Sequence, residues 1–175
     1  SAILTLDAGT SGLKCSVFAL DGTLKGASVA EYPTLYPREG WAEQRPEDFI
    51  RAAVESVRAL GNVIAAEDIC AIGLSGTMNG CIALDGEGNA LYPNIIHLDT
   101  RAQKQVAALS AAMRDAAFYA RTGNRPDVHY GLPKLMWLKE HEPDVYRRAQ
   151  VFVNTKDVIY GFLTGRRDVS DYSDA

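Results

Sequence analysis

Long apolar runs and an excess of positive charge are both missing from this sequence of 175 residues. No apolar run approaches the roughly 20 residues that a membrane-spanning helix needs. The formal net charge of -4 leaves no basic surplus to attract polyanions, which argues against a general binder of nucleic acid or of membrane surfaces. No leader of basic and then apolar residues opens the sequence, so we expect a cytoplasmic protein.

Cysteine is also scarce, and its three residues form no metal-binding or disulfide pattern. Cys15, Cys70 and Cys81 are widely spaced, with no Cys-x-x-Cys pair and no matching His spacing. Each lies within an apolar run, so we expect three reduced and buried side chains, with a reactive thiol as the alternative. The remaining composition, 47% hydrophobic and 23% charged, is typical of a globular domain with a substantial core.

Strand patterns dominate the first third of the sequence. Three apolar segments are separated by Gly-rich or Asp-Gly breaks and predict strands at residues 3–6, 13–20 and 24–32. Asp21-Gly22 predicts a tight hairpin turn between the second and third of these strands. Proline and glycine then predict a loop up to residue 45.

A helix and a second small-residue loop follow. Pro46 predicts the first position of a helix, along which apolar residues recur at helical spacing up to Gly61. Residues 69–74 predict a short buried strand that runs directly into a loop of small residues at 75–80. Beyond it, the pattern predicts strands or short apolar stretches at 81–84, 95–98 and 151–153, and helices at 100–113, 132–141 and 155–163.

The order of these elements argues against two common nucleotide-binding folds. Three strands, a helix and a strand do not show the strict alternation of a dinucleotide-binding fold. The loop at residues 7–12 lacks the G-x-G-x-x-G spacing, and a strand rather than a helix follows it. The P-loop pattern, G-x-x-x-x-G-K followed by Ser or Thr, occurs nowhere in the sequence.

The loop after the first strand combines an acid with small residues. Gly9 and Gly12 permit backbone angles that point successive N–H groups into one concavity, and Thr10 and Ser11 add hydroxyl donors. Such a concavity suits phosphate oxygens. A carboxylate repels phosphate, so Asp7 needs a cation or water in between, which suits a nucleotide bound as its magnesium salt. In the alternative interpretation, Asp7 accepts hydrogen bonds from the turn and the glycines only tighten a hairpin.

Six segments that occur in order give the sequence a family resemblance. They are LDAGTSGLKCSVFALDGTL at 6–24, EGWAEQRPEDF at 39–49, IGLSGTMNGCIALDGEGNAL at 72–91, DTRA at 99–102, LPKLMWLKEHEP at 132–143 and LTGRRDVSDYSDA at 163–175. The series resembles the amino-terminal part of the FGGY carbohydrate kinases, and among them xylulokinase more than glycerol kinase. It covers essentially the whole chain.

The resemblance implies an α/β domain with an actin-like ATPase or ribonuclease-H-like fold, whose mixed sheet begins with three antiparallel strands and has flanking helices. It also implies an enzyme, a kinase that transfers the γ-phosphate of ATP to a hydroxyl of a pentulose such as xylulose, or of a related ketose or polyol. The implied partners are that sugar or polyol and ATP with Mg2+, without nucleic acid or a membrane. A homodimer is left open.

The same resemblance implies that residues 1–175 are the amino-terminal domain of a two-domain kinase, which supplies the sugar pocket and the first phosphate loop. In the family, the catalytic Asp follows in a later glycine-rich segment, and the adenosine site belongs to a carboxy-terminal domain. We therefore expect a truncated chain that lacks both, whose catalytic residue lies beyond Ala175. Alone, such a chain is expected to have negligible kinase activity.

The resemblance also implies two groups of site residues. The first phosphate loop consists of Asp7, Gly9, Thr10 and Ser11, with Asp7 near the magnesium ion. The contacts to the sugar come from the positions that match the family's pocket: Met78, Asn79, Gly80, His97, Asp99, Arg101 and His129.

Two of the implied sugar contacts depart from the family pattern. Asn79 stands where xylulokinases have His, and His97 stands where many members have Trp. Both replacements keep hydrogen-bonding capacity but change shape and charge, as a different ketose or polyol would require. As alternatives, Asn79 is a turn residue between two glycines, and His129 is a surface histidine that flanks a helix.

Two further functions stay open at this point. The chain could be a non-catalytic sugar-binding or interaction module with the same fold. It could also be a hydrolase of the ribonuclease-H type that uses Asp7 within a cluster of metal-binding acids. That hydrolase needs several acids around one pair of metal ions, whereas the nearby acids Asp21 and Asp85 lie in predicted turns.

Overall fold

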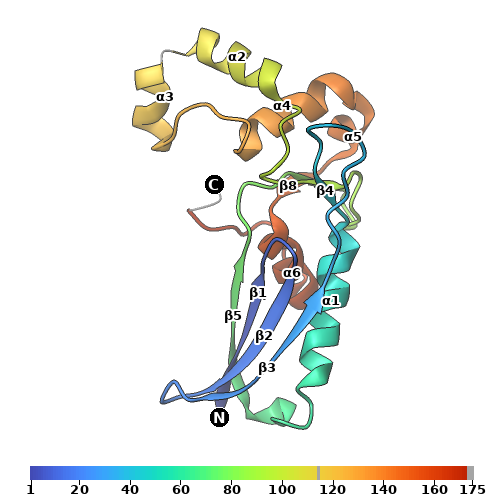
Figure 1. The fold of residues 1–175 in the computed structure, drawn as a ribbon, viewed down its shortest axis with the longest axis vertical. Helices are drawn as coiled ribbons and strands as arrows, with labels where there is room; N and C mark the ends of the chain where they lie inside the picture. Colours follow the sequence, from blue (N-terminus) through green and yellow to red (C-terminus); the bar gives the residue numbers. More distant parts are fainter. Residues whose placement is uncertain (114, 173–175) are drawn as a thin grey trace.

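The structure is a computed structural model that describes residues 1–113 and 115–172. Residues 173–175, the end of the last family-like segment, lie outside the described residues. A four-stranded sheet with helices α1 and α6 occupies one end of the molecule, and helices α2 to α5 gather at the other end (Figure 1). None of the described helices combines the length and the apolar character that crossing a membrane requires.

The sheet begins with three antiparallel strands, as the sequence predicts. They are β1 (Ala2–Ala8), β2 (Gly12–Ala19) and β3 (Leu24–Glu31), and β5 (Ile69–Gly76) completes the sheet in the order β3-β2-β1-β5. β5 runs parallel to β1, so the sheet is mixed.

The turn between β2 and β3 confirms the Asp21-Gly22 prediction. Gly22 has a φ of +87°, in the left-handed region that glycine reaches without a steric cost. The Ala19 amide donates to the Thr23 carbonyl at 2.8 Å, and the Thr23 amide donates to Asp21 Oδ1 at 2.9 Å. Both contacts close the hairpin locally, which is why two adjacent residue types sufficed to predict it.

The main core lies between the sheet and two helices, α1 (Pro46–Ala59) and α6 (Thr155–Thr164) (Figure 1). α1 begins at Pro46, as predicted, and buries Phe49, Ala52 and Ala53. α6 buries Val158 and Ile159 in the same core. Residues at alternate positions of β1 and β2 face these helices and are buried: Ala2, Leu4, Leu6, Ala8, Leu13, Cys15 and Val17.

Short strands and further helices make up the rest of the chain. β4 (Glu43–Gln44) pairs with β7 (Asn94–Ile95), β6 (Ile82–Leu84) pairs with β8 (Val151–Val153), and the remaining helices are the 3-10 turn Ala66–Asp68, α2 (Gln103–Ala112), α3 (Asp115–Thr122), α4 (Gly131–His141) and α5 (Pro143–Arg148). The sequence predicted α2, α4 and α6 to within a few residues, but it predicted neither α3, α5 nor β4.

Two predictions about the segment at residues 69–74 are wrong. The predicted buried strand, β5, is largely exposed, with Ile72 48% exposed. Cys70 is exposed as well, and its thiol lies 3.3 Å from the Ala2 carbonyl oxygen. The reason is position: β5 lies at the edge of the sheet, and within the described ranges β1 is its only neighbouring strand.

Two other details of the sequence interpretation are settled by the structure. Cys15 and Cys81 are buried as predicted, and burial raises the pKa of their thiols to about 11 and about 12. Within the short apolar stretch at 95–98, Ile95 pairs in strand β7 together with Asn94, and Leu98 is 50% exposed.

Candidate functional site

The loops at residues 9–11 and 77–80 lie side by side at one end of the sheet. β1 and β5 are parallel, and their pairing continues up to Ala8 and Gly76. The loops that follow the two strands therefore begin at the same end of the sheet. The Ala8 carbonyl accepts hydrogen bonds from the Thr77 amide at 2.8 Å and from Thr77 Oγ1 at 3.1 Å. The structure therefore brings together the two loops that the sequence singled out separately.

The carbonyls of the 9–11 loop are turned toward the protein. Tyr32 Oη donates to the Gly9 carbonyl at 2.5 Å, and the Tyr32 amide donates to the Ser11 carbonyl at 3.3 Å. Gln44 Nε2 donates to the Thr10 carbonyl at 2.6 Å. Within the described part of the chain, the amides of Thr10 and Ser11 have no hydrogen-bond acceptor. The Gly9 amide donates to the Gly12 carbonyl at 3.0 Å and so closes the turn, which leaves the amides of Thr10 and Ser11 as the donors that can bind an anion.

Asp7 lies beside this loop with an exposed side chain. Lys14 is its direct partner in the neighbouring antiparallel strand, so the two side chains lie on the same side of the sheet. Burial raises the pKa of the Tyr32 phenol, and the negative charge of Asp7 raises it further, so Tyr32 keeps the proton that it donates to Gly9.

The described residues include no metal site built from protein side chains alone. No group of three or more His, Cys, Asp or Glu side chains gathers anywhere in residues 1–113 or 115–172. A hydrolase of the ribonuclease-H type needs such a cluster of acids, so the described residues give that hypothesis no support. One carboxylate beside unused amides instead fits Mg2+ that is held mainly by phosphate oxygens and water.

The 77–80 loop is held in a strained shape by buried polar groups. Asn79 has a φ of +66°, which is uncommon for a residue other than glycine. The amide of Cys81, two positions on, donates to Asn94 Oδ1 at 3.1 Å and to the Ile95 carbonyl at 3.2 Å. Asn94 is 1% exposed, and its Nδ2 donates to Thr155 Oγ1 at 3.3 Å. Contacts from β7 thus fix the backbone that follows Asn79 and Gly80, and Thr155 at the start of α6 holds Asn94 in place.

Gly80 leaves no room for a side chain. A Cβ atom at this position would lie 2.6 Å from Asn94 Oδ1 and 3.3 Å from Asn154 Oδ1. We expect Gly80→Ala to lower the free energy of unfolding by about 1 to 3 kcal/mol, because either the loop or Asn94 must move. Urea unfolding measures this loss. The matched control is Gly86→Ala, where a Cβ meets nothing within 4 Å; an equal loss in both variants would contradict the explanation.

Lys134 is the site residue that the sequence interpretation missed. Its side chain is completely buried, and Nζ donates to the carbonyls of Asn79 at 2.8 Å, His129 at 2.5 Å and Tyr130 at 3.2 Å. It lies within the LPK segment, but a lysine on a helix usually faces solvent. The signal that could have found it is its spacing from two buried residues of α4, Trp137 and Leu138, on the same face of the helix.

Burial lowers the pKa of Lys134 from its ordinary value of 10.5 to about 8. Between these two values the unfolded chain binds more protons than the folded chain, so the free energy of unfolding rises with pH. We expect Lys134 to contribute a rise of roughly 1 to 3 kcal/mol between pH 8 and about 10. The raised pKa values of Cys15 and Cys81 act in the opposite direction above about pH 9, and that of Tyr32 does so at higher pH. Urea unfolding at several pH values should show that the free energy of unfolding of the unmodified chain, relative to that of Lys134→Met, rises over this range, since the thiols and Tyr32 act in both proteins; identical pH profiles would contradict it.

Two predicted sugar contacts, His97 and His129, meet beside Lys134. Their rings are 5.4 Å apart in an edge-on arrangement. Burial lowers the pKa of His97, and the nearby His129 and Lys134 lower it further, so the neutral ring is favoured. His97 Nδ1 is buried without a hydrogen-bond partner in the described ranges. Met78, in the 77–80 loop, is 44% exposed.

Asp99 and Arg101 form a buried ion pair. Arg101 Nη2 lies 2.7 Å from Asp99 Oδ2 and 2.8 Å from Glu43 Oε1, and the side chains of Arg101 and Asp99 are 1% and 0% exposed. The Ala42 amide donates to Asp99 Oδ2 at 2.6 Å. The Arg101 guanidinium also lies 3.6 Å from the ring centroid of Trp41. In this conformation both side chains link the loops around the site to one another. Neither side chain is exposed, so neither is accessible for the sugar contact that the family resemblance implies.

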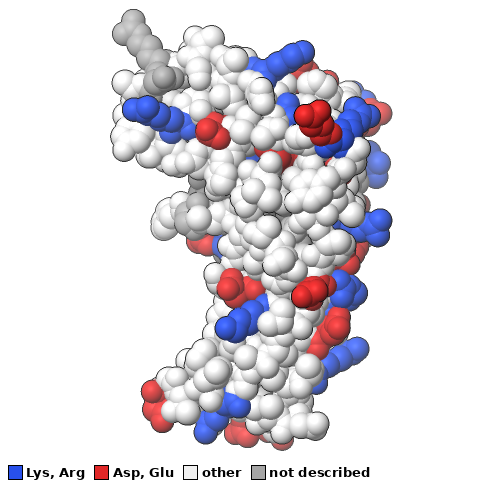
Figure 2. All heavy atoms as spheres, viewed as in Figure 1, with Lys and Arg blue, Asp and Glu red and all other residues white. Residues whose placement is uncertain are grey.

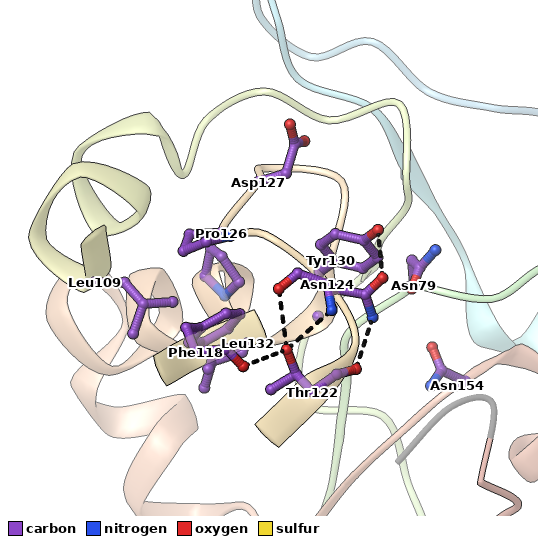
Figure 3. Close-up of a pocket in the computed structure, with 12 residues that line it drawn as sticks. Asn79, Leu109, Phe118, Thr122, Asn124, Pro126, Asp127, Tyr130, Leu132 and Asn154 are labelled. Carbon is purple, nitrogen blue, oxygen red and sulfur yellow. Dashed lines mark hydrogen bonds between the residues drawn. The ribbon is translucent and has the colours of Figure 1, made fainter. Parts of the chain in front are cut away.

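A cavity of about 390 Å³ opens beside the 77–80 loop (Figure 3). Its apolar part comes from α2, α3 and α4 through Leu109, Phe118 and Leu132, and Asn79 is the only predicted site residue that lines it. Tyr130 Oη donates to Asn124 Oδ1 at 2.9 Å across its rim. The cavity therefore adjoins the predicted sugar contacts on the side of the helical end of the molecule.

The comparisons with known proteins agree with this geometry. Residues 2–175 match the sequence model of the FGGY family of carbohydrate kinases, N-terminal domain. The chain belongs to the FGGY family. It is 35% identical over 163 residues to the xylulose kinase of Staphylococcus xylosus, covering 93% of this chain and 34% of that protein. It is 31% identical over 175 residues to the xylulose kinase of Bacillus subtilis, covering 99% of this chain and 35% of that protein.

Solved structures of FGGY relatives confirm the fold. A crystal structure described as a xyloylose kinase from Brucella ovis is 36% identical, with a TM-score of 0.89 over 95% of this chain and 35% of that chain. The xylulose kinase from Rhodospirillum rubrum is 29% identical, with a TM-score of 0.90 over the same shares. The fold is thus the actin-like ATPase fold that the family resemblance implied. The chain spans about a third of the length of these FGGY relatives.

Proposed function

We propose that the protein containing this chain is an ATP-dependent kinase of a ketose or polyol, with a pentulose such as xylulose as the first candidate. The observation that carries the proposal is the pairing of the 9–11 and 77–80 loops at one end of the sheet, through the hydrogen bonds between Thr77 and the Ala8 carbonyl. Membership of the FGGY family supports it, and so do the xylulose kinases among its relatives.

In this proposal, the 9–11 loop binds the phosphates of ATP. The unused amides of Thr10 and Ser11 donate to phosphate oxygens, while Tyr32 and Gln44 hold the loop carbonyls away from the negative charge. When bound, Mg2+ would be held by Asp7 together with phosphate oxygens and would neutralise part of the phosphate charge. On the face shown in Figure 2, acidic and basic side chains are interspersed and form no broad basic surface.

The sugar lies, in the same proposal, against Asn79, His97 and His129. The amide of Asn79 and the two imidazoles can each donate and accept hydrogen bonds, which suits hydroxyl groups that do both. Met78 and Gly80 belong to the 77–80 loop that borders the proposed sugar site. Asp99 and Arg101 hold the surrounding loops in place through their buried ion pair. The catalytic base is assigned to none of residues 1–175, and closure by a second domain would exclude water from the reaction.

The test is phosphorylation of a panel of pentuloses, hexuloses and polyols by the full-length protein that contains residues 1–175. We expect one ATP consumed per sugar phosphate formed with at least one ketose or polyol. Sugar binding without phosphoryl transfer would instead support a non-catalytic module. Absence of both binding and transfer would contradict the proposed function.

The isolated chain tests the proposed division into domains. We expect residues 1–175 alone to have negligible kinase activity, because we propose that the family's catalytic Asp and adenosine site lie outside these residues. An assay that couples ADP release to a colour change measures this, with the full-length protein as the control. Turnover by the isolated chain would contradict the proposed division.

The cytoplasmic location and the homodimer stay predictions.

A further inference from the structure

Lys134 is a buried charged residue to which the proposed function assigns no role. It extends from α4, is completely buried, and has three carbonyl oxygens within hydrogen-bonding distance. A lysine ammonium has three protons and no acceptor, so three carbonyls satisfy it fully. The Asn79 carbonyl lies 55 positions away in the sequence, whereas the other two belong to the turn that leads into α4. One nitrogen thus joins two distant segments.

The contacts of Lys134 differ from those of a buried ion pair. No carboxylate of the described residues lies within 4 Å of its Nζ; Asp99 and Asp127 attract the charge from further away, and Arg101 opposes it. Burying an ammonium without a carboxylate in direct contact is costly. A methionine would fill similar space without that cost, so the packing of α4 alone does not account for a lysine here. The three backbone contacts are what a methionine could not supply.

Two of the carbonyls belong to residues with predicted sugar contacts. Asn79 lines the cavity of Figure 3, and the ring of His129 packs edge-on against the ring of His97. Because one nitrogen binds the backbones of Asn79 and His129, a shift of either backbone stretches a hydrogen bond to a fully buried charge. The hydrogen bonds of the buried Lys134 therefore fix the distance between these two segments.

We infer that Lys134 is a positioning residue, which holds the 77–80 loop and residues 129–130 at one separation and thereby sets the geometry of the sugar contacts. This inference rests on the proposed function, since it assumes that Asn79, His97 and His129 face the sugar. Lys134 itself is buried beneath them and acts through their backbones. Its loss should therefore weaken sugar binding more than it affects ATP, which the 9–11 loop binds.

The test compares Lys134→Met with Lys139→Met in the full-length protein. Lys139 lies on the same helix, is exposed, and contacts only the ring of Tyr146 among the interactions recorded for it. We expect Lys134→Met to raise the KM for the best sugar of the panel by roughly tenfold, while the KM for ATP stays within about twofold. Lys139→Met should change neither value. Equal sugar KM values in all three proteins would overturn the inference, as would equal rises in both KM values.

A second measurement uses the unmodified protein, so it does not depend on whether a variant folds. With 13C-labelled backbone carbonyls, the signals of Asn79, His129 and Tyr130 should all shift along one titration curve near pH 8, where Lys134 loses a proton. Among the other groups facing Lys134, the pKa of Cys81 is raised to about 12, that of His97 is lowered, and that of Arg101 is raised, so none of these three accounts for a curve near pH 8. Three independent curves, or no shift near that pH, would overturn the inference.

The two measurements separate failure of this inference from failure of the proposed function. If the unmodified protein neither binds nor phosphorylates any sugar in the panel, the proposed function fails, and Lys134 can no longer position sugar contacts. If the unmodified protein is active but Lys134→Met keeps its sugar KM, only the positioning role fails. In either case, the carbonyl titration tests whether Lys134 bridges the two segments.

Discussion

Replacing Asp7 by asparagine in the full-length protein is expected to lower kcat/KM for sugar phosphorylation by roughly a hundredfold or more. Asn keeps the size of the side chain but removes the negative charge that would hold Mg2+ against the phosphates. The side chain is exposed and forms no hydrogen bond that the structure records, so stability should barely change. Steady-state kinetics at several Mg2+ concentrations provide the measurement.

The matched control for Asp7 lies at the other end of the same sheet. Asp21 is also exposed, and its Oδ1 accepts a hydrogen bond from the Thr23 amide, which an asparagine oxygen can also accept. Asp21→Asn should therefore leave kcat/KM within about twofold of the unmodified protein. Equal activity of Asp7→Asn and the unmodified protein at every Mg2+ concentration would contradict the role proposed for Asp7.

Replacing Asp99 by alanine is expected to give the largest loss of stability, about 3 to 5 kcal/mol of unfolding free energy. The change leaves the Arg101 guanidinium, which is 1% exposed, with Glu43 as its remaining carboxylate partner. It also removes the acceptor of the Ala42 amide. A buried cation that loses half of its compensating charge cannot regain it from water. Urea unfolding of the chain measures the loss.

An exposed ion pair supplies the comparison for Asp99. Arg166 and Asp168 lie 3.2 Å apart, but their side chains are 59% and 72% exposed. Water replaces such a contact, so Asp168→Ala should change the free energy of unfolding by less than about 1 kcal/mol. Similar losses of unfolding free energy for Asp99→Ala and Asp168→Ala would contradict the claim that burial makes the Asp99–Arg101 ion pair important for stability.

The sequence predicted those parts of the fold that short-range signals determine. Asp21-Gly22 closes a hairpin through contacts two to four residues apart, and Pro46 begins α1 at its own position. The exposure of β5 was not predictable in this way. Its apolar letters suit a buried strand, but its place at the sheet edge depends on pairing with β1, more than 60 residues earlier.

The site was predicted in its parts but not in its connections. Asp7 and the 9–11 loop were found from residue types alone, because an acid beside small residues suggests phosphate chemistry. The family resemblance supplied Asn79, His97 and His129, whose meeting beside one helix no local pattern could reveal. Lys134 was missed because a single lysine letter does not tell whether the side chain reaches solvent. Its partners are backbone carbonyls, which leave no trace in the sequence.

Arg101 and Asp99 show a similar limit. The Asp-x-Arg spacing was noted and assigned to sugar contact from the family resemblance. Their burial depends on Glu43 and Ala42, more than 50 positions away, together with the ring of Trp41. Sequence spacing therefore identified the pair, whereas tertiary packing decided that it joins loops in this conformation.

One measurement tests the central claim most directly, that paired loops at one end of the sheet hold the phosphates and the sugar. It is a crystal structure of the full-length protein with Mg2+, a non-hydrolysable ATP analogue and the best sugar of the panel. We expect phosphate oxygens at about 3 Å from the amides of Thr10 and Ser11, and sugar hydroxyls at the same distance from Asn79 or His129. Phosphates bound away from the 9–11 loop, or a sugar with no contact to Asn79, His97 or His129, would contradict the claim.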